Sequence, residues 1–249
     1  MTVARIDSSD VPQGPPSRGT KLGYGLTAAV VRPSMRAIVR QDWQDTHKIP
    51  RTGAILAMNH IAEIDPVSVA HMVYNQGLLP TFLAKAELWK IPVVGSIMRG
   101  TRMIPVQRTN DAGRSLAAAK AVLGHGGVIM VYPEGTVTRD PERWPMTART
   151  GAVRLALQTG APLIPVGQWG IHELMPYPSH SLKPFPRKTA HVRVGDPVEL
   201  ADLRDKPMTA TVLREGTERM MADITAIVAD LRGEAAPQGR WDLQRGERI

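Results

Sequence analysis

A histidine and an aspartate stand five residues apart in the segment Asn59-His60-Ile61-Ala62-Glu63-Ile64-Asp65-Pro66, directly after the apolar run 53–58. The run predicts a strand, and Asp65-Pro66 predicts a helix start, because Asp is a favoured cap and Pro a favoured first helical residue. Across such a junction this spacing can return the carboxylate to the imidazole. A carboxylate so placed makes the imidazole a general base, since it fixes the tautomer and stabilises the protonated ring. His60 and Asp65 are therefore candidates for a catalytic pair.

Further polar residues follow other apolar runs: Lys85, Arg108 and the turn Pro133-Glu134-Gly135-Thr136. In α/β sheets, ligands bind beyond the carboxyl ends of the strands. A base, a carboxylate and several cations at one rim suit a phosphorylated substrate whose hydroxyl is deprotonated. Taken singly, each group also has an ordinary explanation: a hydrogen-bonded histidine, a helix cap, a turn or a solvated surface charge.

Strand and helix patterns alternate along the chain. The predicted strands or extended segments are 53–59, 81–84, 103–106, 128–132, 163–166 and 190–194, and the predicted helices are 66–76, 111–123, 150–159 and 208–231. Near-continuous apolar strands separated by helices predict an α/β fold with a buried, largely parallel sheet and helices on both faces. The 249 residues are enough for one large core.

The formal net charge is +8, and residues 18–51 alone contribute +5 of it. This charge indicates a partner that carries phosphates. Pro33 predicts the start of a helix with one apolar face (Met35, Ile38, Val39, Trp43) and a basic pair on another face (Arg36, Arg40). Such a helix suits either an anionic lipid surface or packing on the protein's own core with a solvated basic face. No apolar run reaches the ~18–20 residues of a membrane span, and we expect no signal peptide.

The predicted organisation has four parts. Residues 1–19, rich in Ser, Pro and Gly, are expected to be disordered; 20–50 form the basic amphipathic helical segment; 51–233 form the catalytic domain; and 234–249 form a loose tail. The sequence has no cysteine, which excludes disulfides, thiolate metal sites and cysteine nucleophiles.

Three other functions fit the residues less well. A metallohydrolase could use His60, Glu63 and Asp65, but the spacing is not that of a His-Glu-x-x-His motif and the other histidines are scattered. A dinucleotide site at 23–28 lacks a preceding strand. The positive charge would suit nucleic acid, yet no aromatic platform or recognition motif accompanies it, so we expect no nucleic-acid partner.

The order of the motifs resembles the glycerolipid acyltransferases, in particular the 1-acylglycerol-3-phosphate (lysophosphatidic acid) acyltransferase family. The matching blocks, in family order between about residues 53 and 166, are Asn59-His60…Asp65, Lys85-Ala-Glu87-Leu88 with Gly100…Ile104-Pro-Val-Gln-Arg108, Pro133-Glu134-Gly135-Thr136, Arg149-Thr150-Gly151 and Ile164-Pro165-Val166. One departure is Val137, where the family often has arginine; here Arg139 follows two positions later.

The resemblance implies direct acyl transfer from a thioester to the free hydroxyl of 1-acylglycerol 3-phosphate, giving phosphatidic acid. His60 would be the base and Asp65 its orienting partner, with no acyl-enzyme; the sequence has no Gly-x-Ser-x-Gly elbow. The substrate-binding residues it implies are Asn59, Lys85, Arg108, Glu134, Gly135, Thr136 and Arg149. Lys85 and Arg108 would hold the phosphate.

Acyl-CoA or an acyl carrier protein would be the co-substrate, with no cofactor and no metal. The resemblance also favours membrane contact for the basic segment, and hence a peripheral enzyme on the cytoplasmic face of an anionic membrane. Alternative acceptors are glycerol 3-phosphate, another lysophospholipid or a glycolipid, and the non-enzymatic alternative is a membrane-surface protein.

Overall fold

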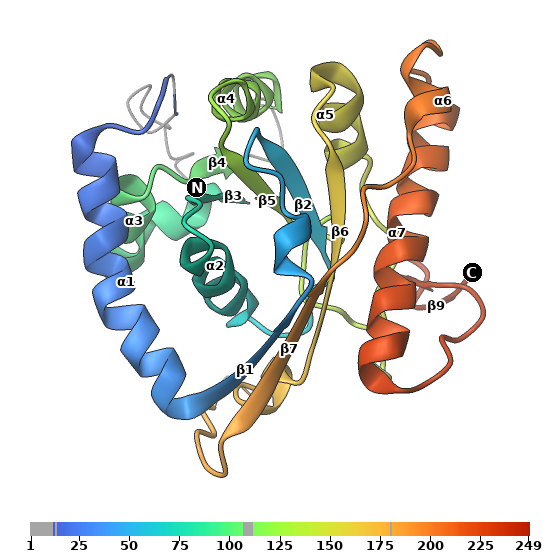
Figure 1. The fold of residues 1–249 in the computed structure, drawn as a ribbon. Helices are drawn as coiled ribbons and strands as arrows, with labels where there is room; N and C mark the ends of the chain where they lie inside the picture. The colour runs from blue at the N-terminus through green and yellow to red at the C-terminus, as the bar shows by residue number, and fades with distance from the viewer. Residues whose placement is uncertain (1–11, 13, 107–111, 180) are drawn as a thin grey trace.

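The computed structural model describes residue 12 and residues 14–106, 112–179 and 181–249. Along these residues, helices and strands alternate as the apolar pattern predicts (Figure 1). The first half contains α1 (Arg18–Ile38), β1 (Val39–Gln44), β2 (Ala54–Met58), α2 (Asp65–Asn75), β3 (Pro80–Lys85), α3 (Pro92–Gly100), β4 (Ile104–Val106) and α4 (Ala112–Gly124). The second half contains β5 (Val128–Val131), α5 (Gly151–Thr159), β6 (Leu163–Trp169), β7 (Lys188–Val194), α6 (Ala201–Arg204), α7 (Ala210–Arg232), β8 (Trp241–Asp242) and β9 (Glu247–Arg248). Single 3-10 turns lie at Thr46–Lys48, Ala86–Lys90 and Ile171–Glu173.

One seven-stranded sheet, in the order β1-β7-β6-β2-β5-β3-β4, runs through the domain. The five strands from β6 to β4 are parallel to one another, β7 is antiparallel to β6, and β1 is parallel to β7. The prediction of an α/β domain with a largely parallel sheet is confirmed. Strand β2 lies at the centre, so the residues that follow it stand between the ends of β5 and β6.

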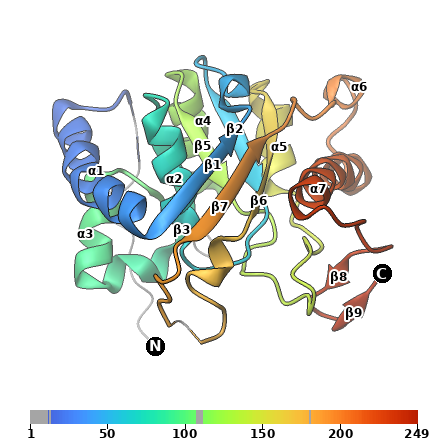
Figure 2. The same ribbon diagram turned by 60° about the horizontal axis from the view of Figure 1, so that its bottom comes forward.

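Helices cover both faces of the sheet, and β2 shows how its sequence serves both. Ile55 and Ala57 join a core cluster with residues of α4, α5 and α7. Ala54, Leu56 and Met58 alternate with them and join a second cluster with residues of α1 and α2. All five β2 side chains are buried, which is why the strand reads as a continuous apolar run. Figures 1 and 2 show α1, α2 and α3 on one side of the sheet and α7 on the other.

The N-terminal segment differs from the prediction in two ways. The helix begins at Arg18, where the Ser17 side chain accepts a hydrogen bond from the Thr20 N–H, and Pro33 lies inside it rather than at its start. It ends at Ile38, and residues 39–44 form β1, which pairs with β7. The predicted face that joined Val39 and Trp43 to a helix is therefore wrong. Pairing with a strand 149 residues further along the chain decided the local structure, and the 3.6-residue spacing could not reveal it.

The disordered stretch predicted for 1–19 is also too long. Arg102 donates to the carbonyls of Gly14 and Pro15, and Arg18-Gly19 form the first turn of α1. Residues 1–11 and 13 lie outside the described residues. Among the helices that are described, none combines the length and apolar character needed to cross a bilayer.

The C-terminal tail is not loose. Strands β8 and β9 pair as an antiparallel hairpin, and Arg240 and Ile249 exchange two main-chain hydrogen bonds of 3.0 Å. Arg240 also pairs with Glu218 on α7, and the Trp241 carbonyl accepts from the Thr147 N–H. The tail looks polar in sequence because ion pairs and main-chain bonds, rather than apolar burial, hold it in place.

Leu56→Ala should lower the free energy of unfolding by about 2–5 kcal/mol, because it leaves a cavity at a fully buried position in the central strand. Leu22→Ala, at a side chain that is 63% exposed on α1, should change it by less than about 0.5 kcal/mol. Urea denaturation followed by circular dichroism measures both. Equal losses in the two variants would contradict the assigned core.

Candidate active site

The histidine and aspartate singled out in the sequence are in direct contact. Asp65 Oδ2 lies 2.9 Å from His60 Nδ1, and the His60 side chain keeps 15% of its surface exposed while that of Asp65 has none. The contact exists because β2 ends at Met58, a short irregular turn follows, and α2 begins at Asp65. With Nδ1 engaged as the donor, Nε2 is the basic nitrogen of the neutral ring.

Asp65 is not the helix cap that the sequence predicts. The residue before α2 is Ile64, and no side chain caps the helix. Asp65 Oδ2 accepts instead from the main-chain N–H groups of Ile61, at 2.6 Å, and Ala62, at 2.9 Å. Complete burial raises the pKa of the Asp65 carboxyl, and the hydrogen bonds from His60, Ala62 and Ile61 oppose that shift. The carboxylate thus shapes the turn and orients the base at once.

Glu134 holds the main chain of the base from the other side. Its Oε1 accepts from the His60 N–H at 3.0 Å, and its Oε2 accepts from the Met146 N–H at 3.0 Å. The pKa of Glu134 is raised to about 8, mainly by burial and in smaller part by the Asp65 and Asp140 carboxylates, while the two backbone hydrogen bonds oppose the rise. The family resemblance implies a substrate contact for Glu134, but in the structure this buried carboxyl group binds the main chain of His60 and Met146.

Asn59 is also turned away from open space. It has no exposed surface, its Nδ2 donates to the Gln168 carbonyl at 3.0 Å, and its Oδ1 accepts from the Gln168 N–H at 2.9 Å. The Gln168 Nε2 returns a bond of 2.6 Å to the Asn59 carbonyl. These bonds continue the β2–β6 pairing beyond Met58. The predicted substrate contact of Asn59 is replaced by a clasp that fixes the residue before His60.

Two side chains at the site were not predicted from sequence. Tyr132, directly after β5, stacks on the His60 ring with centroids 4.2 Å apart, and Phe82 of β3 stacks on Tyr132 at 6.1 Å. Gln168 is the other. Gln168 could have been noticed as a polar residue inside the otherwise apolar buried strand 163–169. Nothing in the residue spacing distinguishes Tyr132.

The remaining predicted residues fall into three groups. Gly135 has a left-handed φ of 76°, and a side chain there would meet the guanidinium of Arg149, whose Nε would lie 3.3 Å from its Cβ. Thr136 is half-buried beside them, and Arg149 itself is exposed. Lys85 is exposed at the end of β3. Arg108 lies outside the described residues, so the structure does not place it.

Within the described residues, no three His, Cys, Asp or Glu side chains gather as metal ligands, so Glu63 does not join His60 and Asp65 in such a group. The chemistry visible in the geometry is that of an oriented imidazole base.

Comparison with known proteins assigns the chain to a family. The sequence profile of the family described as Acyltransferase matches residues 40–169, just over half of the chain. The protein belongs to the acyltransferase family. The match includes His60, Asp65 and the Glu134 turn, so the residues that build the base lie inside the acyltransferase region.

Named relatives are similar over parts of the acyltransferase chain. The 1-acyl-sn-glycerol-3-phosphate acyltransferase of Bacillus subtilis is 27% identical over 159 residues, covering 63% of this chain and 72% of the relative. The enzyme of that name from Borreliella burgdorferi is 31% identical over 124 residues, covering 49% of this chain and 48% of the relative. The chain thus spans about half the length of some relatives that it matches.

A solved structure supports the acyltransferase fold. The crystal structure of the 1-acyl-sn-glycerophosphate acyltransferase from Thermotoga maritima superposes with a TM-score of 0.61 at 20% identity, over 88% of this chain and 80% of the other.

The raised pKa of Glu134 predicts how the stability of the acyltransferase depends on pH. Its value in the folded protein is about 8, above the ordinary 4.5, so the folded state binds the extra proton between these values. The free energy of unfolding therefore falls as pH rises through this window. Glu134→Gln cannot ionise and should show a shallower fall between about pH 5 and about pH 9, measured by urea denaturation. Identical slopes in the two proteins would show that Glu134 is not responsible.

Proposed function

We propose that this acyltransferase moves a fatty acyl group from a thioester to the free hydroxyl of 1-acylglycerol 3-phosphate, and so makes phosphatidic acid. The observation that carries the proposal is the His60–Asp65 pair at 2.9 Å. The names of the relatives support the acceptor, since those from Bacillus subtilis and Borreliella burgdorferi are 1-acyl-sn-glycerol-3-phosphate acyltransferases.

The geometry supports a single displacement. His60 Nε2 removes the proton from the acceptor hydroxyl as its oxygen attacks the thioester carbonyl, while Asp65 steadies the imidazolium. The C–O ester bond forms, the C–S bond breaks, and the leaving thiolate takes the proton back from His60. The donor is acyl-CoA or an acyl carrier protein thioester, and this reaction uses no further cofactor.

An apolar cavity that Phe82 lines suits an acyl chain. It has a volume of about 150 Å³ and lies between α1, α2 and β3, with Val31, Val67, Phe82 and Met103 among its lining residues. Phe82 stacks on Tyr132, which stacks on His60, so the cavity and the base flank one aromatic pair. His71 also lines the cavity; burial and the charges of Arg36 and Arg32 lower its pKa to about 4, so it is neutral at pH 7.

Cations for the acceptor phosphate come from different strand ends. Lys85 is the last residue of β3, and Arg149 lies against Gly135; both are exposed. We propose Arg108 as a third ligand because it belongs to the same family motif. Gly135 and Thr136 then face the glycerol. Glycerol 3-phosphate is the nearest alternative acceptor, because its phosphate would bind the same cations.

The test of this function is an assay of thiol release from palmitoyl-CoA in the presence of 1-acylglycerol 3-phosphate in mixed micelles. His60→Ala should lower the rate by at least roughly 10²–10⁴-fold, because the base is removed. Asp65→Asn should also slow turnover, since it weakens the hold on the ring. Equal thiol release by wild type and His60→Ala would mean uncatalysed hydrolysis, and the proposal would fail for this donor and acceptor.

We also propose that α1 carries a membrane-contact surface. Leu22, Leu26 and Val30 lie four residues apart on one face of this helix and are 63%, 64% and 67% exposed. On the neighbouring α3, Val93 is 71% and Ile97 is 40% exposed. The two helices approach so closely at Gly23 that a side chain there would clash with the Gly100 carbonyl. Exposed apolar groups in the part of the chain with a charge excess of +5 suit an anionic lipid surface.

Replacing Leu22, Leu26 and Val30 together with serine should abolish sedimentation with vesicles that contain anionic phospholipid. Leu243→Ser is the matched control, because this side chain is 48% exposed on the C-terminal hairpin, across the molecule from α1. It should sediment like the wild type. Loss of binding in neither variant, or equally in both, would refute the assignment of the surface to α1.

A further inference from the structure

The loop that follows the Glu134 turn fixes the main chain of the catalytic base at two points. The Thr138 N–H donates to the His60 carbonyl at 2.7 Å. The Met146 N–H donates to Glu134, whose other oxygen accepts from the His60 N–H. The loop 138–147 therefore contacts one peptide group of His60 directly and the other through Glu134.

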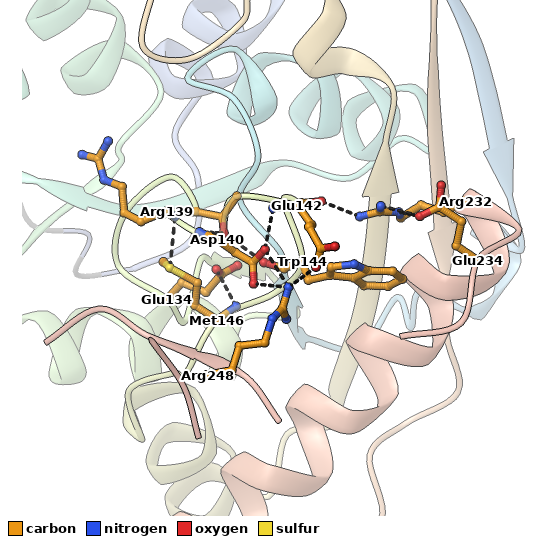
Figure 3. Close-up of polar contacts among 10 residues, drawn as sticks. Glu134, Arg139, Asp140, Glu142, Trp144, Met146, Arg232, Glu234 and Arg248 are labelled. Carbon is orange, nitrogen blue, oxygen red and sulfur yellow. Dashed lines mark hydrogen bonds and ion pairs between the residues drawn. The ribbon is translucent and has the colours of Figure 1, made fainter. Parts of the chain in front are cut away.

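This loop contains neither helix nor strand, so its position depends on what it contacts. Arg232 of α7 donates to the Glu142 carbonyl at 2.8 Å and lies over the Trp144 ring, and both Trp144 and Met146 are buried. The C-terminal hairpin adds ion pairs to these contacts. Arg248 Nη2 lies 3.0 Å from Asp140 Oδ1 and 2.9 Å from Oδ2, and 2.5 Å from Glu142 Oε2. A few residues on, the Thr147 N–H donates to the Trp241 carbonyl at 3.0 Å. Figure 3 shows Arg248 pointing from the hairpin into the loop, with Glu134 and Met146 next to it.

Asp140 is the residue through which Arg248 acts on the loop. The Asp140 side chain has no exposed surface, so its charge is costly unless a cation compensates for it. Arg248 supplies that cation. Without Arg248, Asp140 would keep the hydrogen bond of 2.8 Å from the Glu142 N–H but lose its cation. We then expect the loop to loosen, as Asp140 takes up a proton or turns toward water.

We infer that Arg248 is a positioning residue for acyl transfer, which holds the loop 138–147 through Asp140 and thereby sets the main-chain position of His60. The predicted effect on turnover rests on the proposed function, whereas the predicted effect on the loop rests on the geometry alone. A displacement of about 1 Å at a catalytic group can lower the rate by as much as ~10²-fold, so a shift of the His60 main chain should lower kcat. The cavity proposed for the acyl chain is lined by residues of α1, α2 and β3 and by none of the loop or the hairpin, so the KM for the acyl donor should change little.

The first measurement is hydrogen exchange by mass spectrometry on Arg248→Ala, without substrate. Peptides covering 138–147 and His60 should exchange faster than in the wild type. Arg245→Ala is the matched control, because Arg245 lies in the turn of the same hairpin, where its main-chain N–H donates to Asp242 Oδ1 rather than to the loop. Unchanged exchange in the loop of Arg248→Ala would overturn the inference whether or not the protein transfers acyl groups.

The second measurement is steady-state kinetics below the onset of thermal unfolding of every variant. Arg248→Ala should lower kcat about 10-fold with the KM for the acyl donor within about two-fold of wild type, and Arg248→Lys should recover part of the loss because it retains the charge. In an Asp140→Asn background, Arg248→Ala should have little further effect. Additive losses, or an unchanged kcat despite faster exchange, would overturn the positioning role. No turnover in the wild type would refute the proposed function instead.

Discussion

The Asp65 carboxylate is buried without exposed surface, and one of its oxygens meets three N–H groups contributed by His60, Ile61 and Ala62. A charge in such a place must be satisfied by hydrogen bonds, and the donors that reach it belong to its own turn. The carboxylate therefore folds the turn around itself. The imidazole is oriented by the same contacts that give residues 60–65 their shape, so the base and the turn form as one unit.

The sheet supplies the remaining constraints on this turn. Because β2 is central, His60 follows a strand with β5 on one side and β6 on the other. Glu134 reaches the His60 main chain from beyond β5, and Gln168 clasps Asn59 from β6. These contacts use main-chain atoms of residues 59–60 or the Asn59 side chain. The His60 imidazole is therefore left to bind Asp65. This division lets several buried polar groups fix the backbone without taking up Nε2.

The sequence was most informative where function and local structure coincide. The strand ends, the His60–Asp65 pair and the Glu134 turn could be predicted, because apolar runs mark buried parallel strands and ligands gather at their carboxyl ends. The roles of Asn59 and Glu134 could not, since the spacing of residues does not show whether a polar group faces a substrate or the main chain. β1 and the C-terminal hairpin were missed for a related reason. Trp43 pairs with Val192 and Arg248 pairs with Asp140, and such distant partners leave no periodic signal.

The contacts that shape the base also join segments far apart in the chain. Glu134 lies 74 residues from His60, and Gln168 lies 109 residues from Asn59. Closing each of these long loops costs conformational entropy before the contact is gained. A fragment that kept the first motif but lacked β5 and β6 would contain every side chain of the pair and lack the backbone geometry that aligns it. The catalytic centre is in this sense a property of the completed sheet, assembled only when the last of its central strands has been added.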